Sequence, residues 1–218
     1  MKTPNRIAGA YFSPTGTTRS VVSCLANELG RLFNIPVVLT DFTVPAGRIA
    51  PLQFEGDDLV ILGTPVYAGR VPNVLLKYLS QLSGKKAAGI PIVLFGNRAY
   101  DDALVELRDI LVRGGVTPIA AGAFVGEHSF SRILAAGRPD KKDLEDVKRF
   151  AFEVFNGWAS IQEPAPIQAP GTPYPYRGYF SPRNSQGNSF DFKKIVPFTD
   201  DNCTGCGTCA RICPMGSI

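Results

Sequence analysis

Four cysteines between positions 203 and 213 have the spacing of a metal-binding site. Two residues separate Cys203 from Cys206 and Cys206 from Cys209, and three residues separate Cys209 from Cys213. Thiolates are soft ligands, and at these separations they can surround one face of an iron–sulfur cubane. Zinc is the competing metal, although structural zinc sites usually pair two short hooks across a longer insert. We therefore predict an iron–sulfur cluster, with the ligands Cys203, Cys206, Cys209 and Cys213.

The distribution of cysteines also indicates the redox compartment. A disulfide framework would scatter cysteines along the chain, whereas this clustering is typical of a metal site in a reducing compartment. Cys24 stands apart, beside the apolar face of a predicted helix, where we expect a buried and inert thiol. Gly205 and Gly207 leave room for backbone N–H groups to approach cluster sulfur.

A hydroxyl-rich loop near the N-terminus has the residues of a phosphate site. An apolar run from Ile7 to Phe12 predicts a strand, and apolar residues at helical spacing from Val21 to Leu32 predict a helix. Gly16 permits a tight turn between them, and the helix start offers free N–H groups and a positive dipole end. The candidate phosphate ligands are Ser13, Thr15, Gly16, Thr17 and Thr18.

The first loop is not a nucleoside-triphosphate loop, because it lacks a Lys followed by Ser or Thr. It also lacks the second and third glycines of a dinucleotide fingerprint. A monophosphate held by neutral donors fits better, and the alternative is a set of capping residues on an ordinary helix.

Two later loops carry residues suited to a flat ring. Each follows an apolar run, 58–64 for one and 90–95 for the other, that reads as a buried strand. A tyrosine in each loop offers flat apolar contact, and the alternative is a pair of ordinary turns with surface tyrosines. The candidates are Pro65, Val66, Tyr67, Ala68 and Gly69 in one loop, and Gly96, Asn97, Arg98, Tyr100 and Asp102 in the other.

Several charged residues near these loops admit two interpretations. Asp101 and Asp102 suit either the site or the start of the next helix. His128 is the only histidine, and it could contact a ligand or serve a structural role. Arg70 could neutralise negative charge on a bound ligand or recruit a substrate, but a surface arginine is the default expectation.

The elements that position these loops alternate along the chain. We predict further strands at 36–42, at a sheet edge, and at 118–125, with a loop over 45–56. Predicted helices span 73–82, 103–113 and 140 or 141 to 158. Alternating strands and helices predict an α/β fold whose parallel sheet is covered on both faces. The ligand loops then converge beyond the carboxyl ends of the strands.

The N-terminal part of the sequence resembles the flavodoxins. The pattern Ser-x-Thr-Gly-x-Thr after the first strand, with the two later loops, carries the resemblance. It implies a five-stranded doubly wound sheet of order 2-1-3-4-5 that binds flavin mononucleotide (FMN). It also implies that Tyr67 or Tyr100 stacks on the flavin ring, while the backbone near Ala68 and Gly69 approaches its N5 edge.

Composition sets the boundaries of the remaining chain. Prolines and aromatic residues from 162 to 197 indicate a partly extended linker, whose rings at Tyr174, Tyr176, Tyr179 and Phe180 favour docking on a surface. We therefore predict a flavodoxin-like FMN-binding domain at 1–161, a linker at 162–197 and a ferredoxin-like segment at 198–218.

The whole chain resembles flavodoxin–ferredoxin fusion proteins, because the cysteine run is the one found in bacterial-type ferredoxins. The resemblance implies an electron carrier between a 4Fe–4S cluster and FMN, with a redox partner protein or a small-molecule acceptor. The alternatives are an FMN-dependent reductase of a small molecule such as a quinone, and a non-redox module that binds zinc and a phosphate ligand. Either the four cysteines serve one cluster alone, or the sequence is truncated and a second run with half the ligands of two clusters is absent. The residues after Cys213 resemble the link to a second ferredoxin half, so we expect the truncated sequence.

Charge and hydropathy exclude other classes. The net charge of +4 includes no long basic run, so we expect no nucleic-acid partner. No apolar segment approaches the roughly 20 residues of a membrane span, and the first residues do not form a signal peptide. We therefore expect a soluble cytoplasmic protein.

Overall fold

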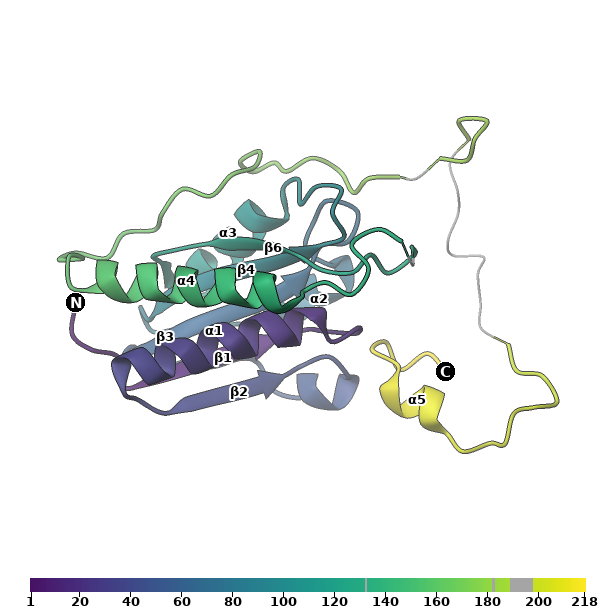
Figure 1. Cartoon of the computed structure of the whole chain (residues 1–218), viewed down its shortest axis with the longest axis horizontal. Helices are drawn as coiled ribbons and strands as arrows, with labels where there is room; N and C mark the ends of the chain where they lie inside the picture. The colour runs from purple at the N-terminus through teal and green to yellow at the C-terminus, as the bar shows by residue number, and fades with distance from the viewer. Residues whose placement is uncertain (132, 182, 189–197) are drawn as a thin grey trace.

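The computed structural model describes residues 1–131, 133–181, 183–188 and 198–218, and a parallel sheet forms its centre (Figure 1). The order of the main path is β2-β1-β3-β4-β5, and β6 also pairs with β4. The strands are β1 (Arg6–Tyr11), β2 (Val37–Asp41), β3 (Asp58–Pro65), β4 (Ala88–Phe95), β5 (Thr117–Pro118) and β6 (Gly122–Val125). All pairs are parallel, which confirms the predicted α/β class and the order 2-1-3-4-5.

The predicted strand at 118–125 is wrong in one respect, because the chain forms two short strands there. Gly89 pairs with Pro118 in β5, and Ile92 pairs with Gly122 in β6. Three residues, 119–121, therefore face only Ile90 and Pro91 of β4, which leaves one residue too many for a continuous ladder. Pro91 also lacks an N–H to donate at this point. The strand accordingly divides.

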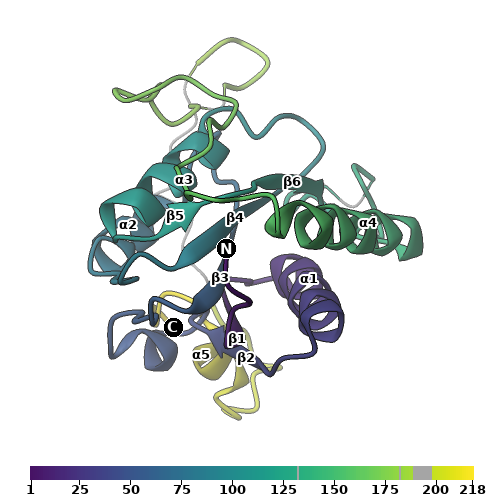
Figure 2. The same ribbon diagram turned by 90° about the vertical axis from the view of Figure 1, so that its left-hand side faces the viewer.

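Helices cover both faces of the sheet (Figure 2). The helices α1 (Thr17–Phe33) and α4 (Lys141–Trp158) lie on one face, and α2 (Asn73–Leu79) and α3 (Ala103–Arg113) lie on the other. The bounds of α3 and α4 agree with the predicted ones, whereas α2 ends at Leu79 instead of Leu82. The N–H groups of Gln81 and Leu82 donate to carbonyls three residues back, so a tighter turn replaces the last predicted turn of α2.

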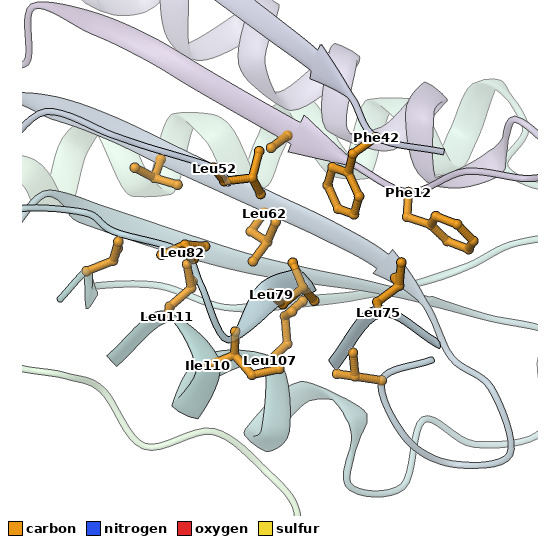
Figure 3. Packing of buried hydrophobic residues seen from close by; sticks show 14 of the residues in the cluster. Phe12, Phe42, Leu52, Leu62, Leu75, Leu79, Leu82, Leu107, Ile110 and Leu111 are labelled. Atoms are coloured by element: carbon orange, nitrogen blue, oxygen red, sulfur yellow. The ribbon is translucent and has the colours of Figure 1, made fainter. Parts of the chain in front are cut away.

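Apolar side chains form a core on each side of the sheet. Figure 3 shows the cluster between the sheet and α2 and α3, whose members include Phe12, Phe42, Leu62, Leu79 and Leu107. The opposite cluster joins α1 and α4 to the other face. A Cβ atom at Gly63 would lie 2.3 Å from Val22 Cγ2, so only glycine allows α1 to approach β3 this closely. This approach fixes the start of α1 beside the end of β3.

The segment at 45–56 departs from the predicted loop. It begins with the 3₁₀ helix η1 (Pro45–Arg48), and Gln53 forms a bridge with Ser83. Proline at the first position of η1 supplies a suitable φ angle and lacks an N–H that would stay unpaired there.

The predicted linker runs along the surface in Figure 1 as far as it is described, while its residues 182 and 189–197 lie outside the described residues. The short helix α5 (Thr208–Ile212) belongs to the cysteine segment. In the described part of the chain, every helix is too short or too polar to span a membrane.

Candidate functional site

The first loop turns sharply into α1 through a left-handed residue. Gly16 has a φ angle of 86°, and its carbonyl accepts a hydrogen bond from the Ser20 N–H at 3.0 Å. The Ser13 hydroxyl accepts the Arg19 N–H at 2.9 Å, so it caps the helix. No described residue accepts the N–H groups of Thr17 and Thr18. Such a helix start is suited to an anion.

Thr18 carries an unpaired buried hydroxyl in this loop. Among the described residues, only the hydroxyls of Thr18 and Thr64 are buried side-chain polar atoms without a hydrogen-bond partner. Both side chains are fully buried, and the Thr18 methyl group lies against Gly63, the residue before Thr64. Buried hydroxyls are normally paired. These two hydroxyls are therefore unpaired polar groups in the layer directly beneath the loop.

A cavity of about 560 Å³ opens beyond the carboxyl ends of β1, β3, β4 and β6. Its volume lies within the roughly 300–1,000 Å³ that is typical of small-molecule sites. The predicted site residues that line it are Thr15, Thr17, Pro65, Val66, Tyr67, Ala68, Gly69, Gly96 and Arg98. The structure thus brings the first loop and both later loops to one place.

A second cavity of about 550 Å³ adjoins the first and reaches the start of α1. Both cavities are lined by Thr15, Thr17, Glu127, His128 and Ser129. Hydroxyls and the helix start lie at this end, while aromatic and aliphatic side chains line the other. A phosphate joined to a flat apolar ring matches this division.

The loop after β3 is a tight turn. The N–H of Tyr67 donates to the Arg70 carbonyl at 2.9 Å, and the Arg70 N–H donates back at 3.1 Å. Ala68 and Gly69 between them have φ angles of 50° and 84°, as a type I′ turn requires. A Cβ at Gly69 would lie 2.7 Å from Asp101 Oδ2, so glycine lets the two later loops touch.

Tyr67 has the position expected for a ring-contacting residue. Its ring lines the cavity and lies edge-on to Phe12, with centroids 6.5 Å apart. Burial raises the pKa of Tyr67, so the phenol stays protonated at neutral pH.

Tyr100 and Asp102 do not line either cavity. Tyr100 packs edge-on against Phe95 with centroids 5.4 Å apart. Asp102 is buried, and its carboxylate accepts the N–H groups of Thr172 and Arg177, each at 2.8 Å. Burial alone would raise the pKa of Asp102, but these two N–H groups, together with the Thr172 hydroxyl and the Arg177 charge, outweigh it and lower the pKa. Asp102 therefore holds the linker.

Four other predicted residues do not line the larger cavity, whereas His128 does. Gly16 lines only the second cavity, and Ser13 caps α1. Thr18 is buried, and Asn97 occupies a left-handed turn position with a φ angle of 62°. His128 lines both cavities, and a Cβ at Gly96 would lie 2.5 Å from its Cδ2 atom. His128 is thus packed at the site.

Arg70 is neither a surface residue nor a cavity residue. Its guanidinium donates to both Glu106 carboxylate oxygens, at 2.7 and 2.6 Å, and the two side chains are 13% and 3% exposed. The rings of Tyr176 and Tyr179 lie 4.7 and 5.0 Å from the guanidinium carbon. Arg70 therefore joins the body of the fold to the linker.

Sequence reasoning missed several residues that line the larger cavity. They are Leu94, Phe95, Ala99, Gly126, Glu127, Ser129, Phe130 and Phe180. Most of them end a predicted strand or follow one, and a wider window around each strand end would have included them. Phe180 belongs to the linker, and the aromatic character of that segment was its only signal.

The cysteine segment has thiols in a setting that favours the thiolate. The hydroxyl of Thr208, 3.3 Å from Cys206 Sγ, is the main cause that lowers the pKa of Cys206 to about 7. Backbone N–H groups, first that of Ser217 at 3.4 Å, lower the pKa of Cys213. In the described residues, no three Cys, His, Asp or Glu side chains are gathered closely enough to hold a metal ion. The donor chemistry nevertheless fits an iron–sulfur cluster.

Arg48 connects this segment to the edge of the sheet that carries the cavity. Its guanidinium donates to the Pro214 carbonyl, and to the carbonyls of Phe42 and Thr43 at 2.9 and 2.7 Å. The same group lies 5.8 Å from the centroid of the Phe12 ring, which in turn faces Tyr67. Figure 1 shows α5 at the same end of the sheet as η1.

Cys24, for which we expect a buried and inert thiol, is less buried than predicted. Its thiol is partly buried and donates to the Leu144 carbonyl at 3.7 Å. Burial raises the pKa of Cys24.

Comparison with known proteins adds two findings. Residues 196–218 match the family described as 4Fe-4S binding domain. Similar solved structures include a Streptococcus pneumoniae TIGR4 flavodoxin, with 18% identity over 68% of this chain and 96% of that chain and a TM-score of 0.48. A flavone reductase is 7% identical over 74% of this chain and 66% of its own, with a TM-score of 0.53. Flavodoxin 2 from Bacillus cereus is 21% identical over 70% of this chain and 99% of that chain, with a TM-score of 0.45.

A search of curated proteins finds no match to the chain. The strand order is that of a flavodoxin-like α/β fold, and the flavone reductase structure, with its TM-score of 0.53, shows a similar fold. The C-terminal match adds a 4Fe–4S binding segment, so the chain combines a flavodoxin-like α/β fold with such a segment. This match favours iron–sulfur over the zinc alternative.

Proposed function

We propose that this protein is an electron carrier that passes single electrons between a 4Fe–4S cluster and FMN. The observation that carries the proposal is the place of the cysteine segment, which Arg48 holds at the edge of the sheet where the cavity opens. The series of contacts from Pro214 through Arg48 and Phe12 to Tyr67 supports transfer within one chain.

The cavity residues support FMN as the ligand. The start of α1 and the hydroxyls of Thr15 and Thr17 would bind the phosphate, and Tyr67 would contact the ring. The backbone of Ala68 and Gly69 would face the polar edge of the ring. When bound, FMN accepts one or two electrons, so it can link a one-electron partner to a two-electron partner.

The four predicted cysteine ligands support the cluster. Positive φ angles at Gly205 and Gly207, 67° and 69°, turn the backbone between successive thiols. These free thiols also support a reducing compartment such as the cytoplasm. The external partner would be a redox protein or a small-molecule acceptor.

Rapid-mixing experiments test transfer between the two groups. The chain is loaded anaerobically with FMN, iron and sulfide and mixed with a one-electron donor protein, and bleaching of the visible flavin band is followed. We expect Cys209→Ser to lose iron and to slow flavin reduction, while Cys24→Ser, outside the cysteine segment, behaves as wild type. Equal rates in the loaded chain and in a Cys209→Ser chain without iron would refute electron transfer through the cluster.

A further inference from the structure

Part of the predicted linker is fixed to the fold and ends at the larger cavity. We call residues 167–180 the strap. At its start the Ile167 N–H donates to the Pro118 carbonyl at 2.9 Å, and Arg108 Nε donates to the Ile167 carbonyl at 2.9 Å. At its end the Phe180 N–H donates to the Ala68 carbonyl at 2.8 Å. The strap therefore runs from β5 to the loop after β3, across α3 (Figure 1).

Two aromatic side chains anchor the middle of the strap. The Tyr176 hydroxyl donates to Asp109 Oδ2 at 2.7 Å, and the Tyr179 hydroxyl donates to the Val71 carbonyl at 2.7 Å. Their rings lie on the guanidinium of Arg70, which also donates to the Arg177 carbonyl at 2.6 Å. A cation held against two rings and a carboxylate is a strong local constraint.

Asp102 adds a buried anchor for the strap backbone. Its carboxylate accepts the N–H groups of Thr172 and Arg177, and it is fully buried beneath them. A Cβ atom at Gly171 would lie 2.6 Å from Val105 Cγ1, so the strap backbone lies directly on α3. The strap thus forms part of the fold over most of its length.

Phe180 differs from the anchors before it. Its backbone is tied to Ala68, yet its side chain is 54% exposed and lines the cavity. The Arg98 guanidinium lies 4.9 Å from the centroid of the Phe180 ring, and Arg98 is also paired with Asp101. The Phe180 ring is thus held at the cavity wall with about half of its surface exposed. This exposed surface can contact a flat ligand in the cavity.

We propose that Phe180 is a flavin-binding residue supplied from outside the flavodoxin-like domain, and that the strap holds its ring against the bound isoalloxazine. This inference rests on the proposed function, because it takes FMN as the ligand of the cavity. Phe180 contributes apolar contact and shields one side of the ring from water. The strap limits the entropic cost of binding, because the anchors order this segment before the ligand arrives.

Titration of the metal-free chain with FMN tests the inference, with quenching of flavin fluorescence as the measurement. The test variant is Phe180→Ala, and the matched control is Phe152→Ala, because Phe152 is a 52% exposed phenylalanine on α4. We expect Phe180→Ala to raise the Kd for FMN by about tenfold, the effect of losing one aromatic contact, and Phe152→Ala to leave it unchanged.

Thermal unfolding with and without FMN separates binding from folding. We expect all three chains to have similar melting temperatures without FMN, and Phe180→Ala to gain less stability when FMN is added. Equal Kd values for Phe180→Ala and wild type would overturn the inference and leave the proposed function intact. A wild-type chain that does not bind FMN would overturn both.

Discussion

Replacing Glu106 by glutamine should destabilise the fold, because this side chain is the partner of a desolvated arginine. Glu106 is 3% exposed, and its two oxygens accept the Arg70 guanidinium, while Oε2 also accepts the Val71 N–H at 2.9 Å. Each hydrogen bond to a charged group contributes about 1.5–3 kcal/mol, and breaking a buried pair costs about 3–5 kcal/mol.

Glutamine can still accept one of these hydrogen bonds, and Arg70 is not wholly buried, so we expect a loss of about 2–4 kcal/mol. The matched control is Glu55→Gln. Glu55 also accepts two hydrogen bonds from a cation, Lys85, at 3.0 and 2.7 Å, but both side chains are more than half exposed. Exposed pairs contribute about 0–1 kcal/mol.

Urea unfolding of the metal-free, flavin-free chain measures both losses. A loss near 3 kcal/mol corresponds to a fall in melting temperature of about 6–12 °C for a chain of this size. Because Arg70 also holds the strap through Tyr176 and Tyr179, Glu106→Gln should weaken FMN binding as well. Equal losses for Glu106→Gln and Glu55→Gln would refute the argument that burial of the Arg70 pair stabilises the fold.

Three further outcomes are expected. Gly16→Ala should weaken FMN binding and cost about 1 kcal/mol of stability, because φ of 86° strains any residue with a Cβ atom, and titration with FMN and thermal unfolding measure the two effects. The pKa of Asp102 is lowered in the folded state, so its ionised carboxylate stabilises the fold at pH values above the ordinary aspartate pKa of about 4. This stabilisation is lost as the pH falls below about 4 toward the lowered pKa. Melting temperatures between pH 7 and pH 3 should therefore fall less steeply for Asp102→Asn than for wild type, and parallel curves would contradict this assignment. The visible absorption spectrum of anaerobically purified protein should show twin flavin bands with a broad brown shoulder. A protein that stays colourless after FMN is added and the unbound FMN is removed would contradict both cofactors.

Local patterns predicted most of the sheet and the helices. Apolar periodicity placed α3 and α4, and the run at 58–64 was recognisable as a strand buried on both faces because its positions from 59 to 63 are all apolar or glycine. The division between β5 and β6 was not predictable in this way. It depends on pairing across β4, where Pro91 and its neighbour face three residues, and such a register is set by residues far apart in the sequence.

The candidate site was predictable as a set of loops but not as a set of contacts. Parallel strands bring their carboxyl ends to one edge, so the sequence placed Thr15, Tyr67 and Gly96 together. Whether a loop tyrosine faces the cavity or the core depends on packing, and Tyr100 turned toward Phe95. The partner of Arg70 lies 36 residues away at Glu106, beyond any local pattern.

The C-terminal quarter of the chain flanks the cavity on two sides. The strap reaches the loop after β3 from α3, and the cysteine segment meets η1 near the edge strand β2. The strap supplies Phe180 to the wall of the larger cavity, whereas the cysteine segment connects to Tyr67 in that wall through Arg48 and Phe12. The strap and the cysteine segment therefore reach the cavity through separate contacts.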